Sequence, residues 1–241
     1  MKLTADLILQ SASHINASMD HELDLRANKI PTIENLGATK DLYDAIDFTD
    51  NEINFLGNFP LLPRLKRLFL SNNRIRSISP TLSSTIPNIN TLVLSNNYFE
   101  QLVDLEPLKD LKYLENLIII GNPVSRISNF RSWLIFRIPQ LRLINFTKIK
   151  DAERTAANAL YLQDNSQLSP LALSILQVSP TNTFEPGQPS SDPSQSTDTP
   201  SSSSLPDNSL ENDQIRANAL NAISNIQSSS IEAALKASQS I

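Results

Sequence analysis

The sequence predicts an α/β solenoid, a stack of short parallel strands joined by irregular return segments. Two observations predict it. One nine-residue pattern recurs five times at nearly constant spacing, and each copy alternates outward and inward residues as a half-buried strand does. The chain has 241 residues, 40% of them hydrophobic. That length is sufficient to bury a substantial core.

The five copies align without a gap. They are ELDLRANKI (22–30), AIDFTDNEI (45–53), RLFLSNNRI (67–75), TLVLSNNYF (91–99) and NLIIIGNPV (116–124). Their shared asparagines are 23, 22, 24 and 25 residues apart: Asn28, Asn51, Asn73, Asn97 and Asn122. This period and pattern are those of a leucine-rich repeat. We therefore expect a right-handed horseshoe with a parallel β-sheet on its concave side.

In each copy, one outward position lies between two inward apolar residues. The inward pairs are Leu23 and Leu25, Ile46 and Phe48, Leu68 and Leu70, Leu92 and Leu94, and Leu117 and Ile119. The shared asparagine comes where the chain turns away, and there its amide can satisfy backbone groups. Prolines in the return segments predict turns and short helices on the convex side.

An array of repeats needs a cap at each end. At the front, Thr4 can cap a short helix that has Asp6 in its first turn. At the back, residues 128–150 indicate a helix, a stop at Pro139 and a last strand, with Trp133 and Phe136 covering the final repeat. The expected repeat domain with its caps covers residues 1–162.

The remaining chain changes composition. Residues 163–209 are predicted to be a disordered linker rich in Ser and Pro, because so few large apolar side chains cannot offset the entropy of ordering. Residues 210–241 regain helical spacing and are predicted to form a short C-terminal helical segment, with a weak, frayed helix as the alternative.

Outward positions of the five strands form a row that changes character along the sheet. The central row runs Asp24, Asp47, Phe69, Val93, Ile118, and Arg26, Arg67 and Ile120 lie beside it. The row is acidic at the front and apolar behind, and a continuous exposed apolar patch usually marks a partner site. We expect a protein helix or the edge of a small domain to bind this concave face. Scattered surface hydrophobic residues are the alternative.

Charge is distributed unevenly along the chain. Residues 1–60 have four Lys and Arg against ten Asp and Glu, whereas residues 61–150 have thirteen against five. A cluster near the back cap supplies candidate RNA contacts: Arg126, Arg131, Arg137, Arg142, Lys148 and Lys150. Such a cluster can bind phosphates. No aromatic residues alternate with it, so we expect it to assist rather than to read bases, and a solvated rim is equally compatible.

No catalytic or cofactor site is expected. The chain has no cysteine, two histidines and four glycines, which excludes disulfides and leaves no spacing for a metal site or a phosphate-binding loop. No run of 18 apolar residues predicts a membrane span, and the N-terminus is a poor signal peptide. We expect an intracellular protein that is not an enzyme and binds no cofactor.

Longer strings resemble a known family. IPTIENLG, DAIDFTDNEI and IPQLRLINFTKIK are similar to the U2 small nuclear ribonucleoprotein A-prime proteins over roughly residues 1–162. The resemblance implies a nuclear, non-catalytic pre-mRNA splicing factor whose horseshoe holds a helix of an RNA-recognition-motif (RRM) protein, B-double-prime. Together they would bind a stem-loop of U2 small nuclear RNA, contribute to branch-site recognition and contact other spliceosome proteins.

Three other classes share parts of this pattern. The strongest alternative is a leucine-rich-repeat regulatory subunit of a protein phosphatase, which typically has more repeats near 22 residues and lacks the IPTIENLG string. Acidic nuclear leucine-rich-repeat phosphoproteins have a long Asp/Glu tail, unlike the Ser/Pro-rich tail here. A purely structural scaffold without an RNA link is the third.

Overall fold

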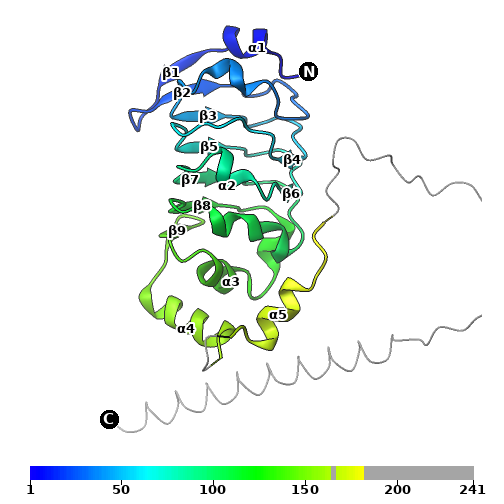
Figure 1. Cartoon of the computed structure of the whole chain (residues 1–241), viewed down its shortest axis with the longest axis vertical. Coiled ribbons are helices and arrows are strands. Elements are labelled where there is room, and N and C mark those ends of the chain that lie inside the picture. The colour runs from blue at the N-terminus through cyan, green and yellow to red at the C-terminus, as the bar shows by residue number, and fades with distance from the viewer. Residues whose placement is uncertain (164–166, 182–241) are drawn as a thin grey trace, which may run out of the picture. The chain divides into compact units, whose positions relative to one another are not determined.

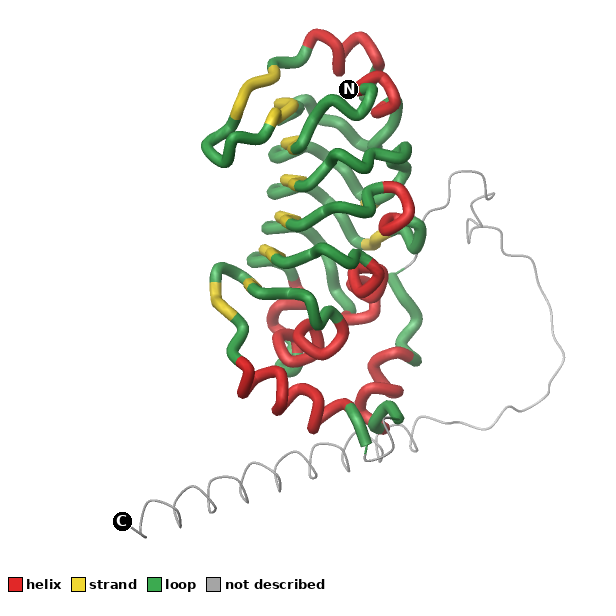
Figure 2. Tube along the Cα trace, turned by 60° about the vertical axis from the view of Figure 1, so that its left-hand side comes forward, coloured by secondary structure: helices red, strands yellow, loops and turns green. Residues whose placement is uncertain are grey.

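The computed structural model describes residues 1–163 and 167–181 (Figures 1 and 2). The helical segment predicted over 210–241, and the part of the predicted linker beyond residue 181, lie outside the described residues. Within the described residues, no helix is long and apolar enough to cross a membrane.

One eight-stranded sheet runs the length of the array (Figure 1). Its order is β1-β2-β3-β5-β7-β8-β9-β10, and the bounds are β1 Ser13–Ile15, β2 His21–Asp24, β3 Ala45–Asp47, β5 Arg67–Phe69, β7 Thr91–Val93, β8 Asn116–Ile118, β9 Leu143–Ile144 and β10 Thr147–Lys148. Pairing is parallel from β2 to β9 and antiparallel at both ends, where β1 and β10 add hairpins. The predicted solenoid with a parallel sheet is confirmed.

The helices of the return segments are short, as the prolines there predicted. The return segments contain a second, two-stranded parallel sheet and four brief helices: β4 Phe55–Leu56, β6 Ser77–Ile78, η1 Leu36–Thr39, α2 Leu82–Thr85, η2 Leu102–Asp110 and η3 Pro123–Arg126. Three of these helices are 3₁₀ helices, and η2 contains Pro107. In Figure 2 they lie across the stack from the main sheet.

A ladder of buried asparagines joins the repeats. Asn73 is representative: its Nδ2 donates to the carbonyl of Phe48 in the preceding repeat at 2.9 Å, and its Oδ1 accepts from the amide of Ile53 at 3.0 Å. Asn51, Asn97 and Asn122 repeat this arrangement. Each buried amide satisfies backbone groups that the turn leaves unpaired, which explains why this residue recurs.

The front cap follows the prediction. Helix α1 spans Ala5–Gln10, and Thr4 Oγ1 accepts from the Leu7 amide at 3.2 Å. Ile8 of this helix and Leu3 just before it are both buried. The helix therefore closes the apolar end of the first repeat.

The back cap consists of α3 (Phe130–Arg137) and α4 (Asp151–Tyr161), which pack against each other. Trp133 is 1% exposed and meets the ring of Tyr161 edge-on at 5.2 Å, so its predicted role in the core is confirmed. Helix α3 ends before Pro139, and the last strand of the array, β9, follows.

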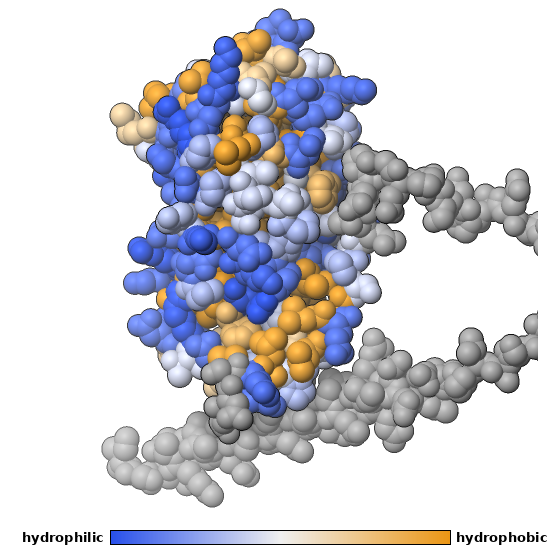
Figure 3. Space-filling view, in the orientation of Figure 1, coloured by the Kyte–Doolittle hydropathy of each residue, from blue (hydrophilic) through white to orange (hydrophobic). Residues whose placement is uncertain are grey.

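The described fold extends beyond the predicted boundary at residue 162. Helix α5 (Pro170–Leu176) falls within the predicted linker, yet Ser169 caps it and Ala172 is buried against the core. Composition averaged over a long stretch concealed this local signal of a Ser-Pro start followed by Leu171 and Ile175. Apolar side chains gather over this end of the described chain in Figure 3, and exposed ones there include Leu160 and Leu173.

Candidate functional site

The concave face is defined here by the outward side chains of β2, β3, β5, β7 and β8. Strand register pairs Asp24 with Asp47 and Asp47 with Phe69. It then pairs Phe69 with Val93, and Val93 with Ile118. Adjacent strands lie about 4.8 Å apart, so the predicted row is continuous.

The back of this face is apolar and open. Phe69, Val93 and Ile118 are each half-buried, although the leucines beside them in the same strands are fully buried. Ile120 is 44% exposed. Phe69 therefore faces outward with part of its ring in contact with solvent.

Sequence reasoning missed two residues that extend the apolar surface. Leu143, in register with Asn116, is 37% exposed, and Phe146 is 75% exposed. Phe146 and the preceding Asn145 form the tip of the β9–β10 hairpin, both at positive φ. A bulky residue in this conformation is uncommon. The Asn at the tip was the available sequence signal for the turn.

The front of the concave face is closed by internal ion pairs. Arg26 donates to Asp24 from Nε at 2.9 Å and from the guanidinium terminus at 2.6 Å, and its Nε lies 3.7 Å from Asp47 Oδ2. The hydrogen bond from Arg26 lowers the pKa of Asp24, and the pair raises the pKa of Arg26. The two carboxylates therefore already share one cation.

A second pair ties the first hairpin to the third strand of the row. Arg67 donates to Asp20, a buried residue of the β1–β2 turn. Ala45, which lies between Glu22 and Arg67 in the strand register, is fully buried. Arg67, predicted to contact a partner, is therefore already paired within the chain, where it ties the β1–β2 turn to β5.

The edge beyond the strands carries a polar ladder. Asn72 Nδ2 donates to Asp50 Oδ1, and Asn96 Nδ2 donates to Asn72 Oδ1, both at 2.7 Å. These residues immediately precede the repeat asparagines and all have positive φ. The next member is Gly121, at φ +79°, where an added Cβ would collide with Asn96 Oδ1.

Two of the six basic candidates, Arg131 and Arg137, are half-buried and held by carboxylates. Arg131 Nε lies 2.8 Å from Glu153 Oε1, and this hydrogen bond lowers the pKa of Glu153 to about 2. Arg137 pairs with Glu106 and its guanidinium lies 5.6 Å from the ring centroid of Trp133. These two residues fasten the back cap, which makes them poor candidates for phosphate contacts.

The other basic candidates are more accessible. Arg142 pairs with Glu115 at 3.2 Å, but 72% of its side chain is exposed. Arg126, Lys148 and Lys150 are exposed. Lys148 is opposite Leu143 in the hairpin register, so both side chains point to the concave side. The predicted cluster is thus divided between cap and surface.

Tyr113 is a further residue that the sequence did not indicate. It is 59% exposed and lines a groove of about 390 Å³ with Arg64 and Lys66. Both cations contact Asp44, at 3.0 and 3.2 Å. The hydrogen bond from Arg64 is the largest of the causes that lower the pKa of Asp44 to about 2.

Among the described residues, no group of three or more His, Asp or Glu side chains could hold a metal ion.

Comparisons with known proteins agree with this geometry. The family model described as "Leucine-rich repeat" matches residues 1–170. A U2 small nuclear ribonucleoprotein A′ of Aspergillus fumigatus is 54% identical over 161 residues, which are 67% of this chain and 63% of that protein. The Homo sapiens protein of the same name is 47% identical over 187 residues, covering 78% of this chain and 72% of its own length.

The chain belongs to the U2 small nuclear ribonucleoprotein A′ family. A crystal structure of a Drosophila melanogaster SNF/U2A′ complex matches with a TM-score of 0.66 and 46% identity, covering 69% of this chain and 95% of that one. Membership makes the chain a non-catalytic leucine-rich-repeat component related to splicing, and confirms the prediction that it is not an enzyme. Membership of this family argues against the alternative, a regulatory subunit of a protein phosphatase.

Proposed function

We propose that this chain is a nuclear subunit of the U2 particle whose concave face holds a helix of an RRM protein, B-double-prime. Through that partner it supports binding of a U2 small nuclear RNA stem-loop and contributes to branch-site recognition. A solved U2A′ relative was crystallised in complex with another protein, SNF. The family name assigns the relatives to the same particle.

The observation that carries the proposal is the apolar half of the concave row. Phe69, Val93 and Ile118 occupy adjacent strands in register and remain partly open to solvent. An amphipathic helix recognises such a groove through side chains at i, i+3, i+4 and i+7. Covering these three side chains would remove further apolar area from water, which favours association.

The first experiment compares Phe69→Asp with Tyr113→Asp. Both replace an aromatic ring by a carboxylate, but Tyr113 lies outside the row. Phe69→Asp should abolish capture of the RRM partner in the presence of the RNA stem-loop, whereas Tyr113→Asp should retain it. Circular dichroism should show both variants folded. Retained capture by folded Phe69→Asp would refute the proposal.

The accessible basic residues provide the RNA part of the proposal. Lys148 and Lys150 lie on and beside β10, next to the exposed Phe146. Replacing both by Glu should weaken the complex of chain, partner and RNA, and should reduce the slope of log affinity against log salt by about 2. The measurement is a titration with labelled RNA at several salt concentrations. An unchanged slope would limit the chain's role to its protein partner.

A further inference from the structure

A groove at one edge of the main sheet lies outside the concave row. Its volume is about 390 Å³, and it forms where the chain enters three adjacent strands, β5, β7 and β8. Its lining residues, called the edge groove here, are Pro63, Arg64 and Lys66 before β5, Asn88 and Asn90 before β7, and Tyr113 and Glu115 before β8. Because they come from successive repeats, only the stacking of the repeats brings them together.

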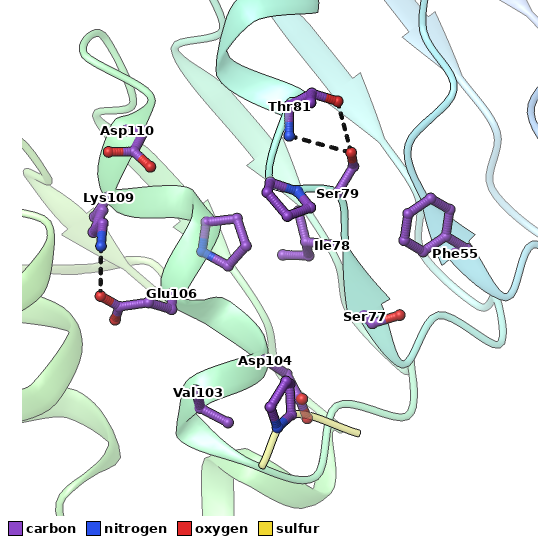
Figure 4. A pocket seen from close by; sticks show the side chains of 13 residues that line it. Phe55, Ser77, Ile78, Ser79, Thr81, Val103, Asp104, Glu106, Lys109 and Asp110 are labelled. Carbon is purple, nitrogen blue, oxygen red and sulfur yellow. Dashed lines mark hydrogen bonds and ion pairs between the residues drawn. The ribbon is translucent and has the colours of Figure 1, made fainter. Parts of the chain in front are cut away.

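A larger pocket on the return side of the stack differs in kind (Figure 4). Its volume is about 800 Å³, and its walls include the apolar side chains of Phe55 and Ile78. The buried carboxylate in this pocket, Asp104, accepts from the amide and the hydroxyl of Thr181, both at 2.8 Å. The chain therefore satisfies this carboxylate itself, and the apolar walls alone do not select one kind of partner.

The cations of the edge groove can bind more acceptors than the chain gives them. Asp44 accepts from Arg64 Nη2 at 3.0 Å and from Lys66 Nζ at 3.2 Å, and Glu115 lies 3.2 Å from Arg142. A guanidinium has five N–H donors and an ammonium has three. The side chains of Arg64 and Lys66 are 48% and 51% exposed. The groove therefore presents positive charge and further donors to an incoming molecule.

An unsatisfied side-chain amide adds a second requirement. Asn90 Oδ1 is buried and, within the described residues, accepts no hydrogen bond. The backbone amide of Asn90 donates to the Lys66 carbonyl at 2.8 Å, so the backbone is fixed independently of the side chain. A buried acceptor without a donor costs free energy. Rotation about χ2 turns this oxygen towards the groove, where an N–H group of a bound molecule can donate to it.

We propose that the edge groove binds an acidic segment of a partner protein, in which an Asp or Glu stands next to an apolar residue. The carboxylate accepts from Arg64 and Lys66, and the apolar side chain covers the ring of Tyr113, which is 59% exposed. A backbone N–H of the segment donates to Asn90 Oδ1. A peptide supplies carboxylate acceptors and N–H donors at once, whereas a phosphate group supplies acceptors alone.

The residue types of the groove are those of a protein interface, since Tyr and Arg are enriched among the side chains that contribute most to binding. The groove is separate from the concave row. Occupation of the edge groove therefore does not depend on the RRM partner, and both surfaces can be covered in one complex.

Short random peptides displayed on phage provide the probe. Peptides that bind Tyr113→Asp, which replaces the ring by a repelling carboxylate, are removed first, and the rest are selected on the full chain. Lys66→Gln keeps a hydrogen-bond donor but removes the charge, so it is the test variant. Phe69→Asp is the matched control on the concave face. Thermal unfolding shows whether each variant is folded.

The selected peptides should contain Asp or Glu. Their dissociation constants should rise at least about tenfold with Lys66→Gln, and also when the peptide carboxylate is replaced by its amide. The effect of Lys66→Gln should decrease at high salt. Phe69→Asp and bound RRM partner should leave the dissociation constants unchanged.

Failure to recover peptides that distinguish the chain from Tyr113→Asp would overturn the proposal. Peptides that bind equally well after the carboxylate is replaced by its amide would also overturn it. Displacement of the peptides by the RRM partner would assign this edge to the concave interface instead. A short single-stranded RNA that binds in their place, with the same dependence on Lys66 and Tyr113, would overturn the proposal in favour of nucleic acid.

Discussion

The two halves of the concave face use the same strand geometry in opposite ways. At the front, Asp24 and Asp47 share Arg26, and Arg67 is held by Asp20, so the charges are satisfied within the chain. At the back, Phe69, Val93 and Ile118 have the same outward orientation and nothing in the described residues covers them fully. The charged groups of the front are paired within the chain, whereas the apolar side chains of the back stay partly exposed.

This difference assigns different roles to the two halves. When a partner covers the apolar back, the complex is stabilised in proportion to the apolar area removed from water. A partner that approaches the front must compete with ion pairs already formed, so charges there should adjust register and association rate more than affinity. The repeat framework is common to both halves, and only the outward side chain differs.

The largest expected effect separates the halves by affinity for the RRM partner. Val93→Asp at the back should raise the dissociation constant at least about 100-fold, since docking would bury an unpaired carboxylate. Asp47→Asn at the front should change it by less than about fivefold. Isothermal titration calorimetry with folded variants measures both. Comparable losses would remove the distinction between the halves.

The next effect concerns the edge of the sheet, where the same repeat position is Ala27 at the front and Gly121 at the back, both at positive φ. Gly121→Ala should reduce the free energy of unfolding by about 1–3 kcal/mol, because the new methyl group meets Asn96 in a strained backbone conformation. Ala27→Gly should change it by less than about 1 kcal/mol. Urea denaturation provides both values. An unchanged free energy of unfolding for Gly121→Ala would show that Asn96 can move to accommodate the methyl group.

A smaller effect tests the closed front kinetically. Arg26→Ala leaves Asp24 and Asp47 without their shared cation, so association with a partner helix rich in Lys and Arg should accelerate about two- to threefold at low salt. Stopped-flow fluorescence at two salt concentrations measures this, and the gain should disappear at high salt. Slower association would mean that Arg26 itself contacts the partner.

The smallest effect is a pH dependence at the back cap. Arg131 lowers the pKa of Glu153 to about 2, so the stabilisation by this pair is complete above the ordinary pKa of about 4.5 and is lost as the pH falls towards 2. Glu153→Gln should therefore lower Tm at neutral pH and flatten its decline over the acidic range. Thermal unfolding monitored from neutral pH to about pH 2 checks this. Parallel curves for both proteins would contradict the assignment.

The structural features that follow from the repeat could be predicted from the sequence. The period determined strand register, and register alone placed Phe69 beside Asp47 and Val93. Thr4 and Trp133 followed from local capping and burial patterns. These features depend on nearest neighbours along the chain or between adjacent repeats.

Features that join distant positions were not predictable in this way. Arg67 meets Asp20 across 47 residues, and Arg137 meets Glu106 across 31, because the stack brings loops of different repeats together. The sequence gives the charged residues but does not indicate which of them form pairs. Phe146 was missed for a different reason: its exposure depends on a left-handed backbone at a hairpin tip, which its residue type disfavours.

Photo-crosslinking from the Phe69 position tests the central claim most directly. A benzophenone amino acid replaces Phe69 in one protein and Tyr113 in another, and each is irradiated with the RRM partner and RNA. The account predicts adducts from the Phe69 position on one face of a single partner helix, at spacings of three or four residues, and none from the Tyr113 position. Adducts from Tyr113 alone, or from Phe69 to RNA instead of the helix, would contradict it.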